Sequence, residues 1–227
     1  MNSIISLKGI SKNYFLNNKV RALRNINLDF KLGKIYSIVG PSGSGKSTLL
    51  NILSLIDKPT RGSIKIDGKL IDYDNQDEND KIRANSIGII YQNYNLLADF
   101  TALENVSLAA LALDKNKKIS FNEAKQIISN LGLSKRIDHF PSELSGGENQ
   151  RIAIARALIN KPKIILADEP TGNLDRLSAK NVFKILLNLK KTKKIIIFAT
   201  HNREFANRAD CKIEMIDGSI KSINGKV

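Results

Sequence analysis

The chain has 227 residues, a hydrophobic fraction of 42%, one cysteine and a formal net charge of +14. This hydrophobic fraction is enough for a buried core and excludes an intrinsically disordered chain. Cys211 is the single cysteine, so an internal disulfide is excluded; we expect it to fill space near a strand in a reducing compartment. The charge suits nucleic acid or an anionic membrane, but the lysines are spread out, with short clusters at 115–118 and 191–194 that we interpret as solvated loops or helix ends.

No membrane-spanning or secretory segment is predicted. Residues 1–10 are too short in apolar length for a signal peptide and lack a cleavage-like segment. The most apolar stretches, 86–90 and 195–200, fall far below the roughly 18 residues that a spanning helix needs. We therefore expect a soluble chain that would act at a membrane only through another, spanning chain.

Apolar, β-branched runs bounded by turns predict the strands. In chain order they are 5–10, 26–30, 35–39, 86–91, 164–168 and 195–200. Two further segments, 63–71 and 213–223, predict hairpins, because each has an Asp-Gly pair between apolar alternations, as a type I′ turn requires.

Helices alternate with the later strands. They are predicted at 48–56, 103–112, 120–131 and 151–159, and after Asp175, where Val182, Ile185, Leu186 and Leu189 share one helical face. This alternation predicts an α/β fold with a mainly parallel core sheet, and the hairpins are expected to form an antiparallel side sheet. Helices 103–112 and 120–131 lack intervening strands and suggest an inserted helical lobe. We predict a single domain, 1–227, with the lobe at approximately 93–160.

The segment GPSGSGKST (40–48) matches the phosphate-binding pattern G-x-x-x-x-G-K-[ST] and lies between a predicted strand and a predicted helix. Its glycines let backbone N–H groups face the phosphates, Lys46 would contact the β- and γ-phosphates, and the Ser47 hydroxyl would bind Mg²⁺. The expected nucleotide-binding residues are Gly40, Pro41, Ser42, Gly43, Ser44, Gly45, Lys46, Ser47 and Thr48.

Four polar side chains follow predicted strands and are expected at the same sheet edge. Asp168 would bind Mg²⁺, and Glu169, on the opposite side of an alternating strand, would act as the general base for water. His201 would contact the γ-phosphate and position the water. The amide of Gln92 would bind Mg²⁺ and sense the γ-phosphate.

A second anion cradle is predicted at LSGGENQ (144–150), where Ser145, Gly146 and Gly147 precede a helix. The order of these motifs, with NLD at 173–175, resembles the ATP-binding cassette of ABC ATPases over nearly the whole chain. That resemblance implies ATP and Mg²⁺ as ligands and two cassettes packed head to tail.

In such a pair the segment 144–150, called the signature segment, faces the nucleotide bound by the partner. The resemblance therefore implies that Ser145, Gly146, Gly147 and Glu148 bind ATP in trans and that Asp175 lies at the interface. It also implies that Tyr14 stacks on adenine. Glu148 departs from the family's usual glutamine; because the backbone donors of the two glycines remain, we expect a tuned clamp.

A closer resemblance, carried by 91–106, 141–148 and 168–175, is to the ATPases of lipoprotein-releasing complexes of the LolCDE type. It implies a homodimer of cassettes working with two integral membrane subunits (LolC/LolE-like), peripheral at the cytoplasmic face of the inner membrane. The segment after Gln92 would contact those subunits. Direct nucleic-acid contact is not expected, because nucleic-acid-linked relatives usually carry coiled coils, zinc modules or two cassettes. A macrolide or peptide efflux ATPase and an FtsE-like cell-division cassette stay open as alternatives.

Overall fold

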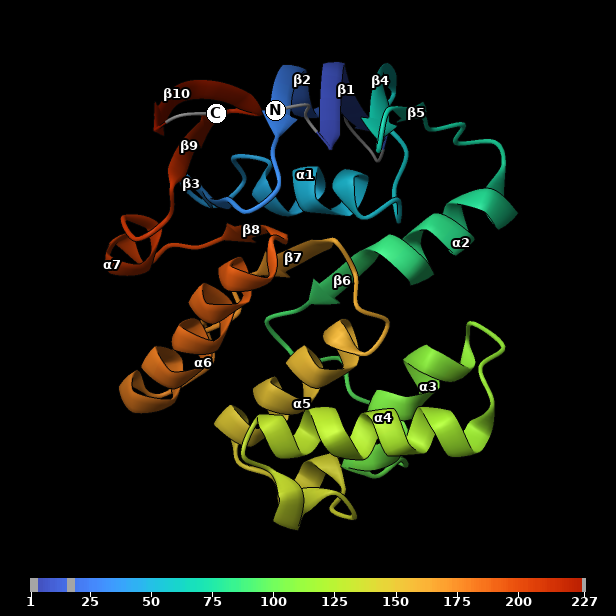
Figure 1. The fold of residues 1–227 in the computed structure, drawn as a ribbon. Helices are drawn as coiled ribbons and strands as arrows, with labels where there is room; N and C mark the ends of the chain where they lie inside the picture. Colours follow the sequence, from blue (N-terminus) through green and yellow to red (C-terminus); the bar gives the residue numbers. More distant parts are fainter. Residues whose placement is uncertain (1–3, 16–18, 226–227) are drawn as a thin grey trace.

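Two β-sheets lie on either side of one helix in the computed structural model, which describes residues 4–15 and 19–225 (Figure 1). The helix is α1 (Lys46–Leu53). Its buried side chains Leu49 and Ile52 belong to one hydrophobic cluster with Leu7 of the first sheet and Ile197 of the second. Burial of this shared apolar surface fixes α1, and with it the loop that precedes it, against both sheets.

The first sheet is antiparallel, in the order β2-β1-β4-β5. Its strands are β1 (Ile5–Phe15), β2 (Lys19–Phe30), β4 (Arg61–Ile66) and β5 (Lys69–Leu70). The β4–β5 turn has positive φ at both Asp67 (50°) and Gly68 (79°), as a type I′ turn requires. The first predicted hairpin is thus confirmed.

The second sheet has the order β10-β9-β3-β8-β7-β6, with five parallel strands and β10 antiparallel to β9. The strands are β3 (Ile35–Val39), β6 (Ile87–Ile90), β7 (Ile164–Asp168), β8 (Ile195–Ala199), β9 (Cys211–Ile216) and β10 (Ser219–Gly225). The predicted parallel core sheet is confirmed.

The second hairpin differs from its predicted place. It does not belong to the side sheet; β9 pairs in parallel with β3, so the hairpin extends the core sheet. Cys211, Ile213 and Met215 alternate along β9 and are all fully buried, in one hydrophobic cluster with α1 and both sheets. A one-sided buried strand of this kind suits either sheet, so its pattern did not separate them. Cys211 is therefore a space-filling residue on a strand, as expected.

The other face of the core sheet is covered by α6 (Arg176–Leu189). The predicted apolar stripe is present: Val182 and Leu186 are buried, and Phe183 joins them. Phe183 stacks on Phe205 of the short helix α7 (Arg203–Ala206), with 4.3 Å between ring centroids. Packing of these rings holds the segment after β8 in place.

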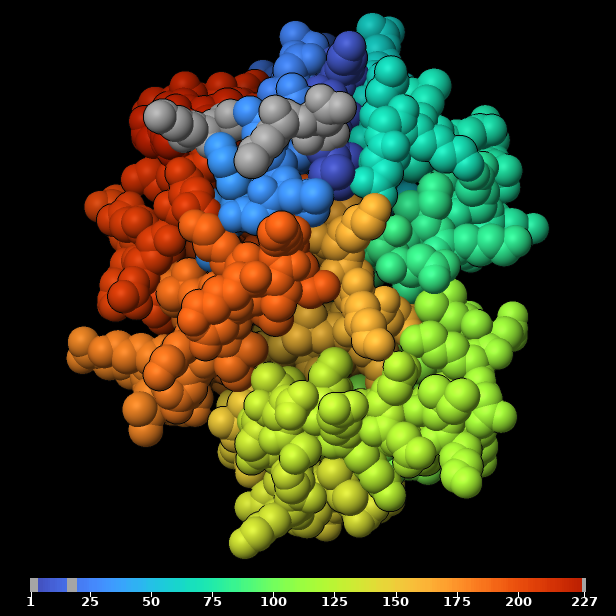
Figure 2. Space-filling view, in the orientation of Figure 1, coloured from blue at the N-terminus to red at the C-terminus, as the bar shows by residue number. Residues whose placement is uncertain are grey.

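A third hydrophobic cluster joins α3 (Ala102–Leu111), α4 (Lys117–Asn130) and α5 (Gly146–Leu158). These helices form the mass that projects below the sheets in Figure 2, within the range predicted for the helical lobe. The division into one domain with a lobe stays a prediction. Short 3-10 turns lie at η1 (Ser134–Arg136), η2 (Pro141–Glu143) and η3 (Lys190–Thr192).

Besides the four-residue α7, one helix was not expected from the sequence, α2 (Gln76–Ser86). Its residues are almost all polar and only Asn79 is buried, so it has no apolar period to reveal it. Its N-terminus is capped by the Asn75 side chain, which accepts from the backbone N–H of Glu78. None of the helices in the described part of the chain is long and apolar enough to cross a membrane.

Candidate functional site

The 40–48 loop connects β3, a central strand of the core sheet, to α1, and its shape depends on two glycines. A Cβ on Gly40 would lie 2.2 Å from the Met215 carbonyl oxygen, and one on Gly45 would lie 2.5 Å from that of Ala22. Gly45 also has φ +97° at the start of α1. Only glycine fits both positions, so the predicted strand–loop–helix geometry is present.

Lys46 lies inside this loop. Its ammonium group donates to the carbonyl oxygens of Gly40 (2.9 Å) and Pro41 (3.0 Å), and the side chain is buried. Burial lowers the lysine pKa, and the nearby carboxylates of Glu169 and Asp168 oppose that shift. The Ser44 hydroxyl is buried and has no hydrogen-bond partner within the described residues. A positive charge and an unused buried donor in one loop fit a phosphate ligand.

Glu169 lies directly after β7, whose last residue is Asp168. The expected strand alternation does not extend to Glu169, because its backbone has φ +45° and leaves the strand. What separates the two carboxylates is this left-handed residue, an uncommon conformation for a side chain other than glycine. Its backbone N–H donates to the Ala199 carbonyl oxygen at 3.1 Å, which fixes the turn against β8.

The Glu169 carboxylate is held beside His201. Oε2 accepts from the His201 backbone N–H at 3.2 Å, and the imidazole Nε2 lies 3.3 Å from Oε1. That second contact is close but is not aligned as a hydrogen bond, so Oε1 is buried without a hydrogen-bond partner in the described part of the chain. Burial raises the pKa of Glu169, and the His201 N–H and Lys46 counteract it. A carboxyl with a raised pKa and a free oxygen is suited to take a proton.

Ser47, Gln92 and Asp168, the expected Mg²⁺ ligands, supply a hydroxyl, an amide and a carboxylate. Mg²⁺ prefers such oxygen donors, with waters and phosphate oxygens completing its shell. Within residues 4–15 and 19–225 there is no group of three or more His, Cys, Asp or Glu that could hold a metal by itself. The three donors therefore fit a Mg²⁺ ion whose shell is completed by waters and phosphate oxygens. This Mg²⁺ site stays a prediction.

Gln92 is bound to a segment that sequence reasoning did not connect with it. Its amide Nε2 donates to Asn173 Oδ1 at 3.0 Å, and Asn173 Nδ2 donates to Asn93 Oδ1 at 2.8 Å. The two segments are 81 residues apart in the chain. The glutamine is therefore joined directly to the loop that ends at Asp175.

A second unpredicted residue, Arg156 of α5, holds the same loop. Its guanidinium donates to the carbonyl oxygens of Tyr94 and Asn95, whose backbones both have positive φ (58° and 50°). The arginine therefore fixes a strained turn just after Gln92 to the signature helix. Asparagine is enriched in this left-handed conformation, but tyrosine is not, so the sequence does not reveal the turn at Tyr94.

Tyr14 lies beside α1. Its hydroxyl donates to Asp57 Oδ2 at 2.8 Å, and Asp57 also accepts from the Lys12 ammonium at 2.5 Å. Lys12 Nζ lies 4.8 Å from the tyrosine ring centroid. The ring is partly exposed and lies close to the phosphate loop, because the side chain of Thr48 is near the same hydroxyl. Its stacking on adenine stays a prediction.

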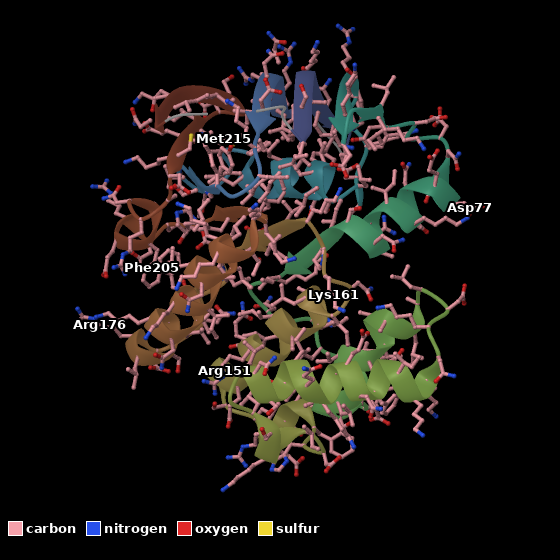
Figure 3. All side chains as sticks on the ribbon, in the orientation of Figure 1. Asp77, Arg151, Lys161, Arg176, Phe205 and Met215 are labelled. Atoms are coloured by element: carbon pink, nitrogen blue, oxygen red, sulfur yellow. The ribbon has the colours of Figure 1, made fainter. Side chains whose placement is uncertain are left out.

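The signature segment begins α5 in the helical lobe; the Arg151 label in Figure 3 marks the first turns of this helix. Ser145 is its N-cap in a capping box with Glu148. The glycines have a packing reason within the chain: a Cβ on Gly146 would lie 2.9 Å from the Tyr94 hydroxyl, and one on Gly147 would lie 2.7 Å from Ser178 Oγ. The small size of Gly147 lets α5 approach α6, and that of Gly146 lets it approach Tyr94.

Asp175 caps the neighbouring helix. Its carboxylate accepts from the backbone N–H groups of Leu177 (2.9 Å) and Ser178 (3.0 Å). The side chain of Ser178 and these backbone bonds lower the pKa of Asp175. Because Ser178 also contacts Gly147, the start of α6 and the start of α5 lie together. The side chain is exposed, so its interface role stays a prediction.

A sequence profile described as "ABC transporter" matches residues 23–172. The chain is 47% identical over 221 residues to the lipoprotein-releasing system ATP-binding protein LolD of Rickettsia bellii (strain RML369-C), covering 96% of this chain and 98% of that protein. It is 42% identical to the probable syringafactin export ATP-binding/permease protein SyfD of Pseudomonas syringae pv. syringae (strain B728a), covering 96% of this chain but 34% of that protein.

Solved structures give the same result for the fold. The ATP-binding cassette MJ0796, solved as a dimer in a post-hydrolysis state with ADP and Pi, superposes with a TM-score of 0.90 at 38% identity, covering 97% of this chain and 98% of that chain. The predicted cassette fold is thereby confirmed. With the profile covering more than half of the chain and a relative aligned over nearly all of it, the chain belongs to the ABC transporter family, as an ATP-hydrolysing cassette.

Proposed function

We propose that this chain powers the release of lipoproteins from the inner membrane, as the ATPase subunit of a complex with two integral membrane partners. The observation that carries the cargo class is the 47% identity to a LolD protein over almost the full length of both chains. Efflux is the second candidate, because a probable export protein is 42% identical over the same part of this chain. The membrane partners would be LolC/LolE-like, and the chain would lie at the cytoplasmic face of the membrane through them.

In the proposed reaction, ATP is bound by the 40–48 loop, with Lys46 on the β- and γ-phosphates and Tyr14 on adenine. Ser47, Asp168 and Gln92 would hold Mg²⁺, which would neutralise charge on the phosphates. Glu169 accepts a proton from the attacking water. His201 would contact the γ-phosphate and position that water, and its backbone N–H also holds the Glu169 carboxylate. Support comes from Oε1 of Glu169, which is buried without a hydrogen-bond partner among the described residues, and from the raised pKa of this carboxyl.

Each composite site would need two chains. Ser145, Gly146 and Gly147 would bind the γ-phosphate held by the partner, with Asp175 at the same interface. Supporting this, MJ0796 is described as a dimer with ADP and Pi, and its fold matches with a TM-score of 0.90. The head-to-tail arrangement makes ATP the link between two copies, and hydrolysis would release them.

The surface proposed for the membrane partner is a groove of 810 Å³ between the helical lobe and the core sheet. Its lining includes Tyr91, Asn95 and Arg156, together with Ala112 and Leu113 of the lobe. Two of these, Asn95 and Arg156, also fix the turn after Gln92. A partner helix in this groove would therefore contact the segment that responds to the γ-phosphate, which is what coupling requires.

The central test is Glu169→Gln. Without its general base, turnover should fall by about 10²–10⁴-fold while ATP binding persists, and a dimer should accumulate with Mg-ATP. Turnover by malachite green and mass by light scattering measure the two effects. Glu204→Gln is the matched control, since this carboxyl lines the same cavity as Glu169 and His201 but is exposed. An active or strictly monomeric Glu169→Gln variant would contradict the assignment.

The cargo is tested by purifying tagged Glu169→Gln from detergent-solubilised native membranes with Mg-ATP. Two distinct membrane subunits together with acylated lipoprotein would support lipoprotein release. One membrane partner present twice would favour efflux, and a cell-wall hydrolase regulator would favour the division cassette. Recovery without any membrane protein would overturn the transporter proposal.

A further inference from the structure

Glu148 binds two donors of Ser145, the residue that begins its own helix. Its Oε2 accepts from both the backbone N–H and the hydroxyl of Ser145, each at 2.8 Å, and its backbone N–H donates back to the Ser145 hydroxyl at 3.3 Å. Ser145 is one of the three residues that the proposed function gives to the partner's γ-phosphate, and its hydroxyl is therefore already bonded to a carboxylate. A carboxylate and a phosphate thus share one small site, where like charges repel.

The other oxygen of Glu148 is held from outside the helix. Arg136, in the η1 turn, donates from Nε to Glu148 Oε1 at 2.9 Å, and its Nη1 lies 3.1 Å from His139 Nε2. Lys135 and Arg151 line a 460 Å³ cavity with the same pair. The hydrogen bonds from Ser145 and the ion pair with Arg136 lower the pKa of Glu148 to about 2, so it is ionised.

A matched box elsewhere in the chain shows that the arginine is not needed for capping. Thr101 and Glu104 start α3 with the same three hydrogen bonds, at 2.8, 2.8 and 3.3 Å. Among the ion pairs of the described residues, Glu104 has none, and only Lys117 acts on it electrostatically. The guanidinium beside Glu148 therefore serves something other than the start of the helix.

We propose that Arg136 is a positioning residue for the trans nucleotide site: it neutralises Glu148 and holds that carboxylate so that the signature segment accepts a partner's triphosphate. The proposal rests on the head-to-tail ATP dimer proposed above. Arg136 acts through Glu148 and does not itself contact the nucleotide. A glutamine at 148 would make this arginine dispensable, which is the basis of the test.

The experiment is a double-mutant cycle in the Glu169→Gln background, read as the ATP concentration that gives half-maximal dimer by light scattering. Arg136→Gln should raise this midpoint by roughly tenfold, because an uncompensated carboxylate then faces the phosphate. Adding Glu148→Gln should return the midpoint to near the parent value. Arg136→Lys keeps the positive charge, so its midpoint should stay close to that of the parent. ATP binding to the monomer, measured with a fluorescent analogue, should stay unchanged throughout.

Lys135→Gln is the control, since it removes the same charge from the neighbouring position and Lys135 makes no ion pair among those of the described residues. An unmoved midpoint in Arg136→Gln, or an equal shift in Lys135→Gln, would overturn the inference alone. So would failure of Glu148→Gln to restore the midpoint, since Arg136 would then act by another route. Absence of any ATP-driven dimer in the parent would overturn both the proposed function and this inference.

Discussion

The two segments proposed to bind phosphate are built in different ways. The 40–48 loop has an internal cation, Lys46, and a backbone that only glycine can form at Gly40 and Gly45. The signature segment is a helix start with no cation of its own, and its donors at Ser145 are already bonded to Glu148. The first is shaped for an anion within one chain, whereas the second is balanced by a carboxylate–arginine pair.

The difference extends to the role of the glycines. In the loop they allow a positive φ that wraps the backbone around a ligand. In the signature segment, Gly146 and Gly147 allow α5 to approach Tyr94 and Ser178 of the same chain. The same residue type therefore shapes the proposed ligand-binding loop in one segment and allows helix packing in the other, and mutations can separate these two roles.

The largest effect is expected at Gly45. In Gly45→Ala the new Cβ meets the Ala22 carbonyl oxygen at 2.5 Å, where φ is +97°. Overpacking should cost roughly 1–3 kcal/mol and the left-handed backbone about 1–2 kcal/mol more, with ATP binding lost as the loop shifts. Urea unfolding and nucleotide titration measure both effects.

The control for that change is Gly33→Ala. Gly33 also has a positive φ (+72°), but a Cβ there would meet no heavy atom within 4 Å among the described residues. It should lose only the backbone contribution and should bind ATP normally. Equal losses of stability and of ATP binding in the two variants would show that the close contact at Gly45 contributes nothing to either.

A smaller effect comes from exchanging the two capping boxes. Ser145→Ala and Thr101→Ala each remove an N-cap hydroxyl with the same hydrogen-bond distances, so each should lose about 1 kcal/mol of stability. Only Ser145→Ala should also raise the ATP concentration needed for dimerisation in the Glu169→Gln background. If both variants dimerised at the same ATP concentration, Ser145 would serve only as a helix cap and not at the trans nucleotide site.

Local patterns predicted most of this architecture because they have local causes. The phosphate loop, the Asp-Gly turns and the apolar face of α6 depend on neighbours within a few residues. The polar helix α2 was missed because its residues bury almost no surface. The second hairpin was assigned to the wrong sheet because alternation along β9 does not reveal its partner, β3.

The unpredicted parts of the site are contacts between distant segments. Asn173 binds Gln92 across 81 residues, and Arg156 binds Tyr94 across 62. Neither partner belongs to a pattern that a single sequence displays. The Glu148–Arg136 pair joins two elements that are 12 residues apart. The sequence alone shows that Glu148 replaces the family's usual glutamine, but it does not show that Arg136 pairs with it.

The smallest effect concerns pH and separates the two capping boxes further. Glu148 has a pKa of about 2 when folded, below its ordinary value of 4.5, so its ionised form stabilises the fold above that ordinary value and the contribution is lost as the pH falls towards 2. The free energy of unfolding of the wild type should exceed that of Glu148→Gln by roughly 1 kcal/mol near neutral pH, after allowance for solvent screening. This difference in stability should decrease steadily below pH 4.5. Urea unfolding at several pH values measures this difference.

Glu104→Gln is the comparison. The Glu104 carboxylate has the same capping box but no arginine partner within the described residues, so the stability difference between wild type and Glu104→Gln should decrease less as the pH falls. Equal slopes would mean that the capping hydrogen bonds, and not Arg136, hold the charge on Glu148.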